Sequence, residues 1–341
     1  MRLTVAIPTY NRNEILKKNI RLLLPQLSDE CKLLIIDNHS DIPVEKTLKP
    51  VLSEFIGIDA RIIRNRANIG AEANFLRCFE YCETEWLWML SDDDEAREDA
   101  VKTILSTISE HKDFIFFNFY TEARTYPVRT EKVLTKGLSE FIEKLDFICS
   151  IIFISPSVYN VNRIIPQIRW GYAMESSCAP LMAILLMSLD NNGLCLFSPK
   201  QIATMGGRDT TPLAQKDYPL SIAMRLSLLL DLPINPAAHR LLTRQISKVT
   251  HTWLNVPTIA NFLAHKGYFE NNYEESLRFY KQISKRLFSL DKSVMIRFMK
   301  YIGYFFVRYP RIFVPLLDMT YKRLKGTEYK YIPAISWQKP E

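Results

Sequence analysis

The sequence lacks several patterns that would assign it to a common class. Its six cysteines form no CxxC pair and have no histidine at zinc-site spacing, so core packing is the expected role of Cys78 and Cys82. The apolar start, residues 3–7, is too short for a signal sequence and stops at Pro8. Neither an internal repeat nor a low-complexity linker is visible. These absences predict a reduced, cytoplasmic protein. The length of 341 residues predicts one large or two ordinary domains.

Acidic residues are scarce at one end of the chain. Residues 240–341 contain 18 Lys and Arg against 7 Asp and Glu, a net charge of +11, whereas residues 1–239 contain 26 against 30, a net charge of −4. This asymmetry predicts a polyanionic partner, either nucleic acid or acidic lipid. Aromatic residues among the cations favour the lipid surface. Since no nucleic-acid-binding motif is recognisable, we expect no nucleic-acid partner.

Residues 294–317 have no uninterrupted apolar run long enough to cross a bilayer. A spanning helix needs about 20 mostly uncharged residues. Here the run is interrupted by two prolines and four cations, Arg297, Lys300, Arg308 and Arg311. We expect a basic, aromatic-rich helix lying in the membrane interface, at the inner face of the cytoplasmic membrane. The alternative is a helix packed on the protein body with its cationic side chains reaching outward.

The first 120 residues alternate short apolar runs with longer periodic segments. Strands are predicted over 3–7, 32–37, 61–64, 86–90 and 114–119, and helices near 12–25, 43–56, 70–82 and 97–110. This alternation predicts an α/β fold with a mostly parallel sheet covered by helices on both faces.

Polar clusters follow four of these strands. They are Pro8-Thr9-Tyr10-Asn11, Asp37-Asn38, Arg64-Asn65 and the acidic run Ser91-Asp92-Asp93-Asp94-Glu95. In parallel sheets, ligands bind at the carboxyl ends of the strands, so these clusters are expected to converge on one edge.

The acidic run directly follows the apolar segment 86–90, which reads as a buried strand. Consecutive carboxylates at the end of a buried strand repel one another and are costly to desolvate, and a divalent cation with oxygen ligands compensates them well. The alternative is a solvated acidic turn that caps the helix beginning near Arg97.

The rest of the chain is less regular. We expect a helix over 173–190 and a short strand near 194–197. A loop over 205–212 is expected to close over a site. From 213 onward the chain is expected to be wholly helical, with turns near 233–236, 267–272 and 309–310. The predicted domains are 1–212, with a nucleotide-binding half at 1–120 and an acceptor half at 121–212, and a basic helical region at 213–341.

The N-terminal third resembles the family 2 glycosyltransferases, which have the nucleotide-sugar-binding GT-A fold. The matching segments occur in the family's order and spacing and cover about residues 3–118; they are Val5–Arg12, Leu34–Asp41, Asn68–Ala71 and Leu90–Asp94. The resemblance implies a Rossmann-like α/β sheet followed by a variable acceptor-binding part.

The resemblance also implies roles for individual residues. The loop that frames the nucleotide is matched by Pro8, Thr9, Tyr10 and Asn11. The acid that hydrogen-bonds the base is matched by Asp37, with Asn38 as the adjacent alternative. The turn near the nucleoside is matched by Asn68 and Gly70. Asp93 and Asp94 match the DxD-type acids, the first near the ribose and sugar and the second on the metal. Because Ser91 stands where the family often has an acid and Asp92 fills the variable position, the ligating carboxylate is uncertain by one residue.

The implied chemistry is transfer of a sugar from a nucleotide sugar. Mg²⁺ or Mn²⁺ on Asp94 would stabilise the charge of the nucleoside diphosphate leaving group. Arg208 would add a second positive charge from the loop. The alternative is that Arg208 is an ordinary solvated arginine. An inverting enzyme also needs a base. Glu175 is the candidate because it opens a predicted helix beside aromatic residues. Its alternative role is that of an ordinary N-terminal helix acid, and Asp209 and Asp217 are the alternative bases.

The leading interpretation is therefore a metal-dependent, inverting glycosyltransferase acting on a glycan or glycolipid acceptor, as in O-antigen, capsule or lipooligosaccharide assembly. A nucleotidyltransferase is the alternative enzyme, but it would show a Gly-rich loop with a lysine after the first strand, which Pro8–Arg12 lacks. A nucleic-acid-binding protein ranks last. The oligomeric state is left open.

Overall fold

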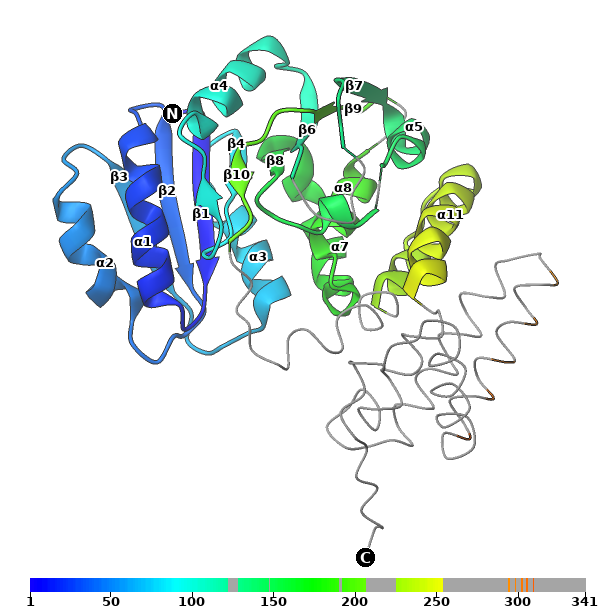
Figure 1. Cartoon of the computed structure of the whole chain (residues 1–341), viewed down its shortest axis with the longest axis horizontal. Helices are drawn as coiled ribbons and strands as arrows, with labels where there is room; N and C mark the ends of the chain where they lie inside the picture. The colour runs from blue at the N-terminus through cyan, green and yellow to red at the C-terminus, as the bar shows by residue number, and fades with distance from the viewer. Residues whose placement is uncertain are drawn as a thin grey trace, which may run out of the picture. The chain divides into compact units, whose positions relative to one another are not determined.

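The computed structural model describes residues 1–121, 128–146, 148–189, 192–206 and 225–253, with single residues at 294, 298, 302, 305 and 309 (Figure 1). The chain splits into two compact units. The first comprises Met1–Arg208 with Asp231–Leu241, and the second comprises Asp209–Leu230 with Leu242–Glu341. The predicted boundary at residue 212 stays a prediction.

An eight-stranded sheet forms the first unit, in the order β3-β2-β1-β4-β8-β6-β9-β7. Its strands are β1 Leu3–Thr9, β2 Cys31–Asp37, β3 Asp59–Arg64, β4 Trp86–Met89, β6 Phe114–Phe119, β7 Val133–Lys136, β8 Ser157–Asn160 and β9 Leu194–Ser198. The pairs β1–β2, β2–β3, β1–β4 and β6–β9 are parallel. The expected mostly parallel α/β sheet is confirmed.

Three antiparallel pairings were not predicted. β8 lies between β4 and β6 and runs antiparallel to both, and β7 is antiparallel to β9. A separate two-stranded ladder joins β5 (Glu95–Ala96) to β10 (Ala203–Thr204). These strands are two to four residues long, too short to show a period of two in the sequence.

One face of the sheet shares an apolar core with three helices, α1 Asn13–Leu23, α2 Val44–Ser53 and α4 Ala100–Glu110. Alternate residues of β1, Leu3, Val5 and Ile7, point into this core. Residues two apart on a strand share a face, so the intervening residues line the other side.

The opposite face is covered by α3 (Ala71–Glu80), α7 (Ile168–Ala173) and α8 (Pro180–Ser188). Phe79 of α3 packs edge-to-face on Tyr159 of β8, with ring centroids 5.2 Å apart. Gly171 lets α7 approach its neighbours, since a Cβ there would lie 2.5 Å from a methyl carbon of Leu76 and 2.8 Å from one of Ile184. Both faces of the sheet are thus buried, as predicted.

The helix predicted over 173–190 is wrong in its extent. The structure has α7, a 3-10 turn η4 at Glu175–Ser177, and then α8. Cys178 adopts the left-handed conformation at φ 57°, and Pro180 opens α8. Proline disfavours a helical conformation in the residue before it and has no N–H to donate, so one continuous helix cannot form through this point.

Other expectations match the structure. The strand predicted near 194–197 is β9. Cys78 is buried and Cys82 is half-buried, and neither forms a disulfide. Within the described part of the C-terminal region, a 3-10 turn η5 at Ser227–Asp231 and helix α11 at Pro236–Trp253 flank the predicted turn. Across the residues that the structure describes, none of the helices combines the length and the apolar character needed to cross a bilayer.

Candidate functional site

The carboxyl ends of β1, β2 and β3 are in register. Thr9 pairs with Asp37, and Asp37 pairs with Arg64. The backbone ladder continues one residue further, because Asn38 N donates to Thr9 O at 2.8 Å and Asn65 N donates to Asp37 O at 2.9 Å. On the other side of β1, Leu90 N donates to Ala6 O at 2.9 Å, which brings the acidic run to the same edge. The predicted convergence of the polar clusters is confirmed.

Asp92 is the buried member of the acidic run, only 4% exposed. Its Oδ2 accepts a hydrogen bond from Thr9 Oγ1 at 2.7 Å, and its Oδ1 accepts one from Arg12 Nη1 at 2.9 Å. Burial raises the pKa of this carboxyl above its ordinary value, against the opposing effects of Thr9 and Arg12. Asp92 thereby connects the loop after β1 to the loop after β4.

Asp93 and Asp94 have different partners. Asp93 accepts from Ser91 Oγ at 2.5 Å and from Arg12 Nη1 at 3.0 Å. Asp94 Oδ2 accepts from Ser155 Oγ at 2.5 Å, and its Oδ1 accepts from the backbone N–H of Gly206 at 2.9 Å. Burial is the largest influence on Asp94 and raises the pKa of its carboxyl. Among the described residues, the side-chain donors and the N–H that hold Asp94 are neutral, whereas Arg12 holds the other two aspartates.

Gly206 lies directly against the acidic run. A Cβ at this position would be 1.6 Å from the carbonyl oxygen of Asp93, so only glycine fits there. The β5–β10 ladder brings it close, since β10 ends at Thr204 and pairs with β5, which begins right after Asp94. Segments 112 residues apart in the sequence therefore meet at Asp94.

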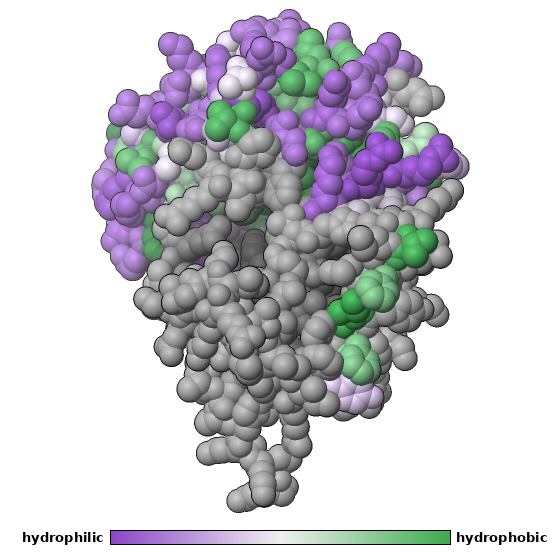
Figure 2. Space-filling view, turned by 45° about the vertical axis from the view of Figure 1, so that its right-hand side comes forward, coloured by the Kyte–Doolittle hydropathy of each residue, from purple (hydrophilic) through white to green (hydrophobic). Residues whose placement is uncertain are grey.

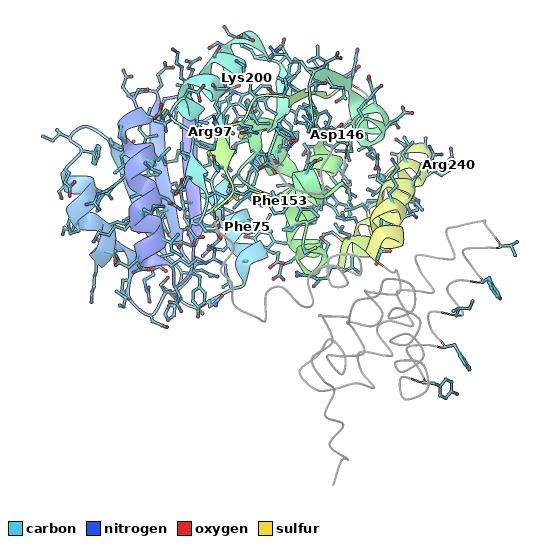
Figure 3. All side chains as sticks on the ribbon, viewed as in Figure 1. Phe75, Arg97, Asp146, Phe153, Lys200 and Arg240 are labelled. Carbon is cyan, nitrogen blue, oxygen red and sulfur yellow. The ribbon has the colours of Figure 1, made fainter. Side chains whose placement is uncertain are left out.

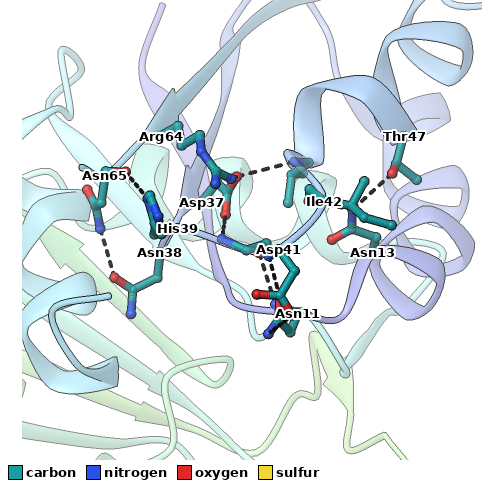
Figure 4. Close-up of polar contacts among 12 residues, drawn as sticks. Asn11, Asn13, Asp37, Asn38, His39, Asp41, Ile42, Thr47, Arg64 and Asn65 are labelled. Carbon is teal, nitrogen blue, oxygen red and sulfur yellow. Dashed lines mark hydrogen bonds and ion pairs between the residues drawn. The ribbon is translucent and has the colours of Figure 1, made fainter. Parts of the chain in front are cut away.

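Asp37, the predicted contact to the base, is 1% exposed and already has protein donors on both oxygens. Its Oδ1 accepts from Ser40 N at 2.8 Å, and its Oδ2 accepts from Val44 N at 3.2 Å and from Arg64 Nη1 at 2.6 Å (Figure 4). These bonds tie the start of α2 to the end of β3. A carboxylate offers about four lone-pair sites, so one more donor can still be accepted on Oδ1.

Asn38, the adjacent candidate, holds the turn before α3. Its Nδ2 donates to Asn68 Oδ1 at 2.8 Å and to Gly70 O at 3.2 Å, while its Oδ1 accepts from Asn65 Nδ2 at 3.0 Å. Gly70 has φ +86°, a conformation that glycine adopts without strain. The structure therefore brings Asn38, Asn68 and Gly70 together, as the sequence predicts.

The loop after β1 is fixed against the loop after β2. Asn11 N donates to Ser40 Oγ at 2.9 Å, and Asn11 Nδ2 donates to Asp41 Oδ2 at 3.2 Å (Figure 4). Asn11, His39 and Cys178 are the non-glycine residues with positive φ in the described part of the chain. All three lie in segments that carry predicted site residues. Such conformations cluster at functional sites.

Glu175, the candidate base, lies in the 3-10 turn η4 and does not open a longer helix. Its Oε1 would lie 3.5 Å from a Cβ built on Gly70, the residue that precedes α3. The carboxylate is half-buried beside the N-terminus of α3, where the helix dipole favours a negative charge. The structure thus places Glu175 next to the predicted nucleoside turn. Arg208, Asp209 and Asp217 lie outside the described residues.

The described residues form no protein cage for a metal. Within the described ranges, no cluster of three His, Cys, Asp or Glu side chains could hold an ion. Mg²⁺ and related cations are often bound by one or two carboxylates together with substrate phosphates. Asp94, with hydrogen-bond donors on both oxygens and lone pairs remaining, fits that kind of site.

Three residues of this edge were not among those predicted from the sequence: Arg12, Ser155 and Gly206. Arg12 ends the first segment that carries the family resemblance, and its charge was the available signal. Ser155 and Gly206 carry no such signal, because their contacts to Asp94 arise from the packing of distant segments.

Comparison with known proteins agrees with this geometry. The family model described as Glycosyl transferase family 2 matches residues 4–153. The chain is 25% identical over 124 residues to the "Uncharacterized glycosyltransferase MG060" of Mycoplasma genitalium, a match that covers 35% of this chain and 42% of that protein.

Similar solved structures include TarS and a mannosyltransferase. TarS 1-349 of S. aureus has a TM-score of 0.62 at 15% identity, covering 97% of this chain and 93% of that one, and a structure of it with UDP-GlcNAc gives the same values. The mannosyltransferase PcManGT from Pyrobaculum calidifontis, solved with GDP-Man and Mn2+, has a TM-score of 0.51 at 10% identity, covering 96% and 88%. These likenesses show the fold. Residues 4–153 thus match the family 2 glycosyltransferases, and the chain has the GT-A fold.

Proposed function

We propose that the protein transfers a glycosyl group from a nucleoside diphosphate sugar to a hydroxyl of a glycan acceptor. The observation that carries the proposal is the meeting of the Thr9, Asp37 and Arg64 strand ends with the acidic run at one sheet edge, inside a glycosyltransferase family 2 domain. Two structural neighbours are described with UDP-GlcNAc and with GDP-Man, which supports this class of donor without choosing the nucleotide.

In this proposal the nucleoside lies between the loop after β1 and the turn at Asn68–Gly70. Pro8, Thr9, Tyr10 and Asn11 frame it, Asp37 and Asn38 face the base, and Asp92 and Asp93 face the ribose and sugar. Tyr10 is 42% exposed and is therefore available to a ligand. Arg208 would add a positive charge near the diphosphate.

A divalent cation, Mn²⁺ or Mg²⁺, would be held by Asp94 together with the donor diphosphate and would neutralise the charge that develops on the leaving group. Ser155 and the Gly206 N–H orient the carboxylate for this role. Ser155, Trp88 and Ser91 form a small rigid group, since Trp88 Nε1 donates to Ser155 O and Ser91 N donates to Ser155 Oγ.

Glu175 is the proposed base of an inverting reaction. It would accept the proton of the acceptor hydroxyl as that oxygen attacks the anomeric carbon and the nucleoside diphosphate departs. Its position beside Gly70, next to the nucleoside turn, supports this role.

Thermal-shift measurements with a panel of nucleoside diphosphates, with and without Mn²⁺, test the proposal and identify the donor nucleotide. We expect one nucleotide to stabilise the protein, more strongly with Mn²⁺, and Asp94→Ala to lose the Mn²⁺-dependent part while keeping the fold. Loss in Asp92→Ala with a normal Asp94→Ala would move the metal site from Asp94 to Asp92. No stabilisation by any nucleotide, or a normal response in Asp92→Ala, Asp93→Ala and Asp94→Ala alike, contradicts the proposal.

The acceptor is proposed to be lipid-linked, with the protein held at an anionic membrane surface by its basic C-terminal region. Residues 240–341 have a net charge of +11. Apolar side chains spaced four or seven residues apart are exposed there: Val294 at 79%, Phe298 at 60%, Phe305 at 53% and Tyr309 at 46% (Figure 2). Cations with exposed apolar residues at helical spacing suit the interface of an anionic bilayer, where each cation contributes about 1 kcal/mol.

Vesicle sedimentation tests this location. The protein should bind anionic vesicles and not neutral ones, less strongly as salt is raised. Charge reversal at Arg297, Lys300, Arg308 and Arg311 should release it while nucleotide binding is kept. A wild-type chain that ignores anionic vesicles at low salt contradicts the membrane location and leaves the donor site untouched.

A further inference from the structure

We propose that Arg12 is a positioning residue that divides the acidic run into two functional parts. It pairs with Asp92 and Asp93, and it thereby leaves Asp94 as the single carboxylate available to a divalent cation. This inference rests on the proposed function and assigns a role to a residue outside the predicted site.

One nitrogen atom of the Arg12 guanidinium contacts both Asp92 and Asp93. Arg12 Nη1 lies 2.9 Å from Asp92 Oδ1 and 3.0 Å from Asp93 Oδ2. Arg12 directly precedes α1, and its backbone oxygen accepts from Leu16 N at 2.9 Å, so the first turn of the helix fixes its main chain. Its side chain is 37% exposed, whereas that of Asp92 is 5% exposed.

Among the described residues, the other partners of the three aspartates are neutral. Thr9 and Ser91 donate hydroxyl hydrogen bonds to Asp92 and Asp93, and Ser155 and the Gly206 N–H donate to Asp94. Arg12 is the described cationic side chain within 4.0 Å of these three carboxylates, and Lys18 pairs with the neighbouring Glu95 instead. Within the described part of the chain, the positive charge of Arg12 is therefore placed on Asp92 and Asp93, and Asp94 has neutral donors.

This arrangement has two consequences. A cation that approaches Asp92 or Asp93 has to displace the guanidinium or share the carboxylates with it, whereas at Asp94 it meets no cationic side chain of the described residues. A nucleoside diphosphate, which is itself an anion, meets a run whose charge Arg12 has reduced. Without Arg12, cations should bind the run more readily and diphosphates less readily.

The test measures binding and needs no turnover. Isothermal titration of the full chain with Mn²⁺ alone, and with the nucleoside diphosphate in EDTA, compares wild type with Arg12→Met, which keeps an unbranched stem and removes the charge. We expect Mn²⁺ to bind more tightly and the diphosphate more weakly, each by about three- to tenfold, the range for a partly exposed ion pair. Arg12→Lys should restore part of both values.

Arg97 supplies the matched control. Arg97, labelled in Figure 3, follows the run closely in sequence. Its Nη1 donates to Gln201 Oε1 at 3.1 Å and not to the carboxylates. Arg97→Met makes the same change in net charge and should leave both affinities near those of wild type. If Arg97→Met shifts them as much as Arg12→Met does, net charge and not pairing is responsible, and the inference fails.

A double variant tests whether Arg12 keeps Mn²⁺ away from Asp92 and Asp93 by pairing with them. Asp94→Ala alone should lose Mn²⁺ binding because Arg12 still occupies Asp92 and Asp93, whereas Arg12→Met with Asp94→Ala should regain weak Mn²⁺ binding at the released carboxylates. A double variant as inert as Asp94→Ala overturns the inference. If Arg12→Met does not fold, Arg12→Gln serves in both experiments. If the wild type binds neither Mn²⁺ nor any nucleoside diphosphate, the proposed function itself is contradicted. This outcome differs from failure of the Arg12 inference, in which the wild type still binds both.

Discussion

Ser155 Oγ donates a 2.5 Å hydrogen bond to Asp94 Oδ2 and accepts one from Ser91 N, so that a single hydroxyl connects both ends of the acidic run to the segment before β8. Ser155 is 2% exposed, and its own backbone oxygen is held by Trp88 Nε1. The hydroxyl is therefore fixed, and it fixes the orientation of Asp94.

Ser155→Ala should weaken Mn²⁺-dependent nucleotide binding about tenfold, since groups that orient a metal-binding carboxylate are worth roughly that much. Nucleotide binding in EDTA should change far less. Ser157→Ala is the matched control, because Ser157 is also buried but contacts Asn118 and not the acidic run. Equal losses of metal-dependent binding in the two variants would show that Ser155 acts only through general stability.

Asp37→Asn should lower the free energy of unfolding by about 2 kcal/mol, because Arg64 and two backbone N–H groups lose a charged acceptor. Arg64→Met should cost a similar amount, and the double variant should cost less than the sum of the two, as measured by urea unfolding.

Nucleoside binding then distinguishes the two roles of Asp37. If the remaining lone pair on Asp37 contacts the base, Asp37→Asn should weaken binding of nucleoside and of nucleoside diphosphate equally, while Arg64→Met spares both. An effect confined to the diphosphate would place Asp37 elsewhere in the site, and no effect at all would make it a residue of the fold alone.

Glu175→Gln should reduce turnover by about 10²-fold or more while donor affinity is kept, because the amide preserves shape and cannot accept the proton. Glu72→Gln is the control: Glu72 is an acid of the first turn of α3, the same helix end that Glu175 approaches. Similar small effects in both variants would assign Glu175 to the helix dipole and turn attention to Asp209 and Asp217. A product that retains the anomeric configuration would remove the need for this base.

Tyr172→Phe should flatten the dependence of stability on alkaline pH. Tyr172 Oη donates to Glu80 Oε1 at 2.9 Å and joins α7 to α3 close to Glu175. Burial first, and then Glu80, raise the pKa of this phenol to about 12. The unfolded phenol titrates near pH 10, so the folded state holds the proton longer. The contribution is complete below about pH 10 and is lost as the pH rises towards 12.

Urea-unfolding midpoints from neutral to alkaline pH check this expectation. The wild type should exceed Tyr172→Phe by less than about 1 kcal/mol at neutral pH, since the hydroxyl is partly exposed, and the difference should vanish at the alkaline end. A difference that persists or grows with pH would mean that the hydroxyl does not donate to Glu80.

Local sequence patterns were enough to predict the strand–helix alternation and the edge at which the site lies. Both depend on local patterns: apolar runs such as residues 86–90 predict buried strands, and Thr9, Asp37 and Arg64 follow or end such runs. Because parallel strands bring their carboxyl ends to one edge, local order was enough to predict that these residues meet. The spacing of the same motifs carried the resemblance to the family.

The partner of each carboxylate follows from packing between distant segments. Arg12, Ser155 and Gly206 reach the acidic run from 80, 61 and 112 residues away. Arg12 arrives through the parallel β1–β4 pair, Ser155 through β8 inserting antiparallel between β4 and β6, and Gly206 through the β5–β10 ladder. Strands β5, β8 and β10 are too short to show a periodic pattern. Likewise, Pro180 and the left-handed Cys178 separate Glu175 from α8, and chain packing then sets it beside Gly70. Pairing between distant segments follows from how helices and strands pack, which no local sequence pattern records.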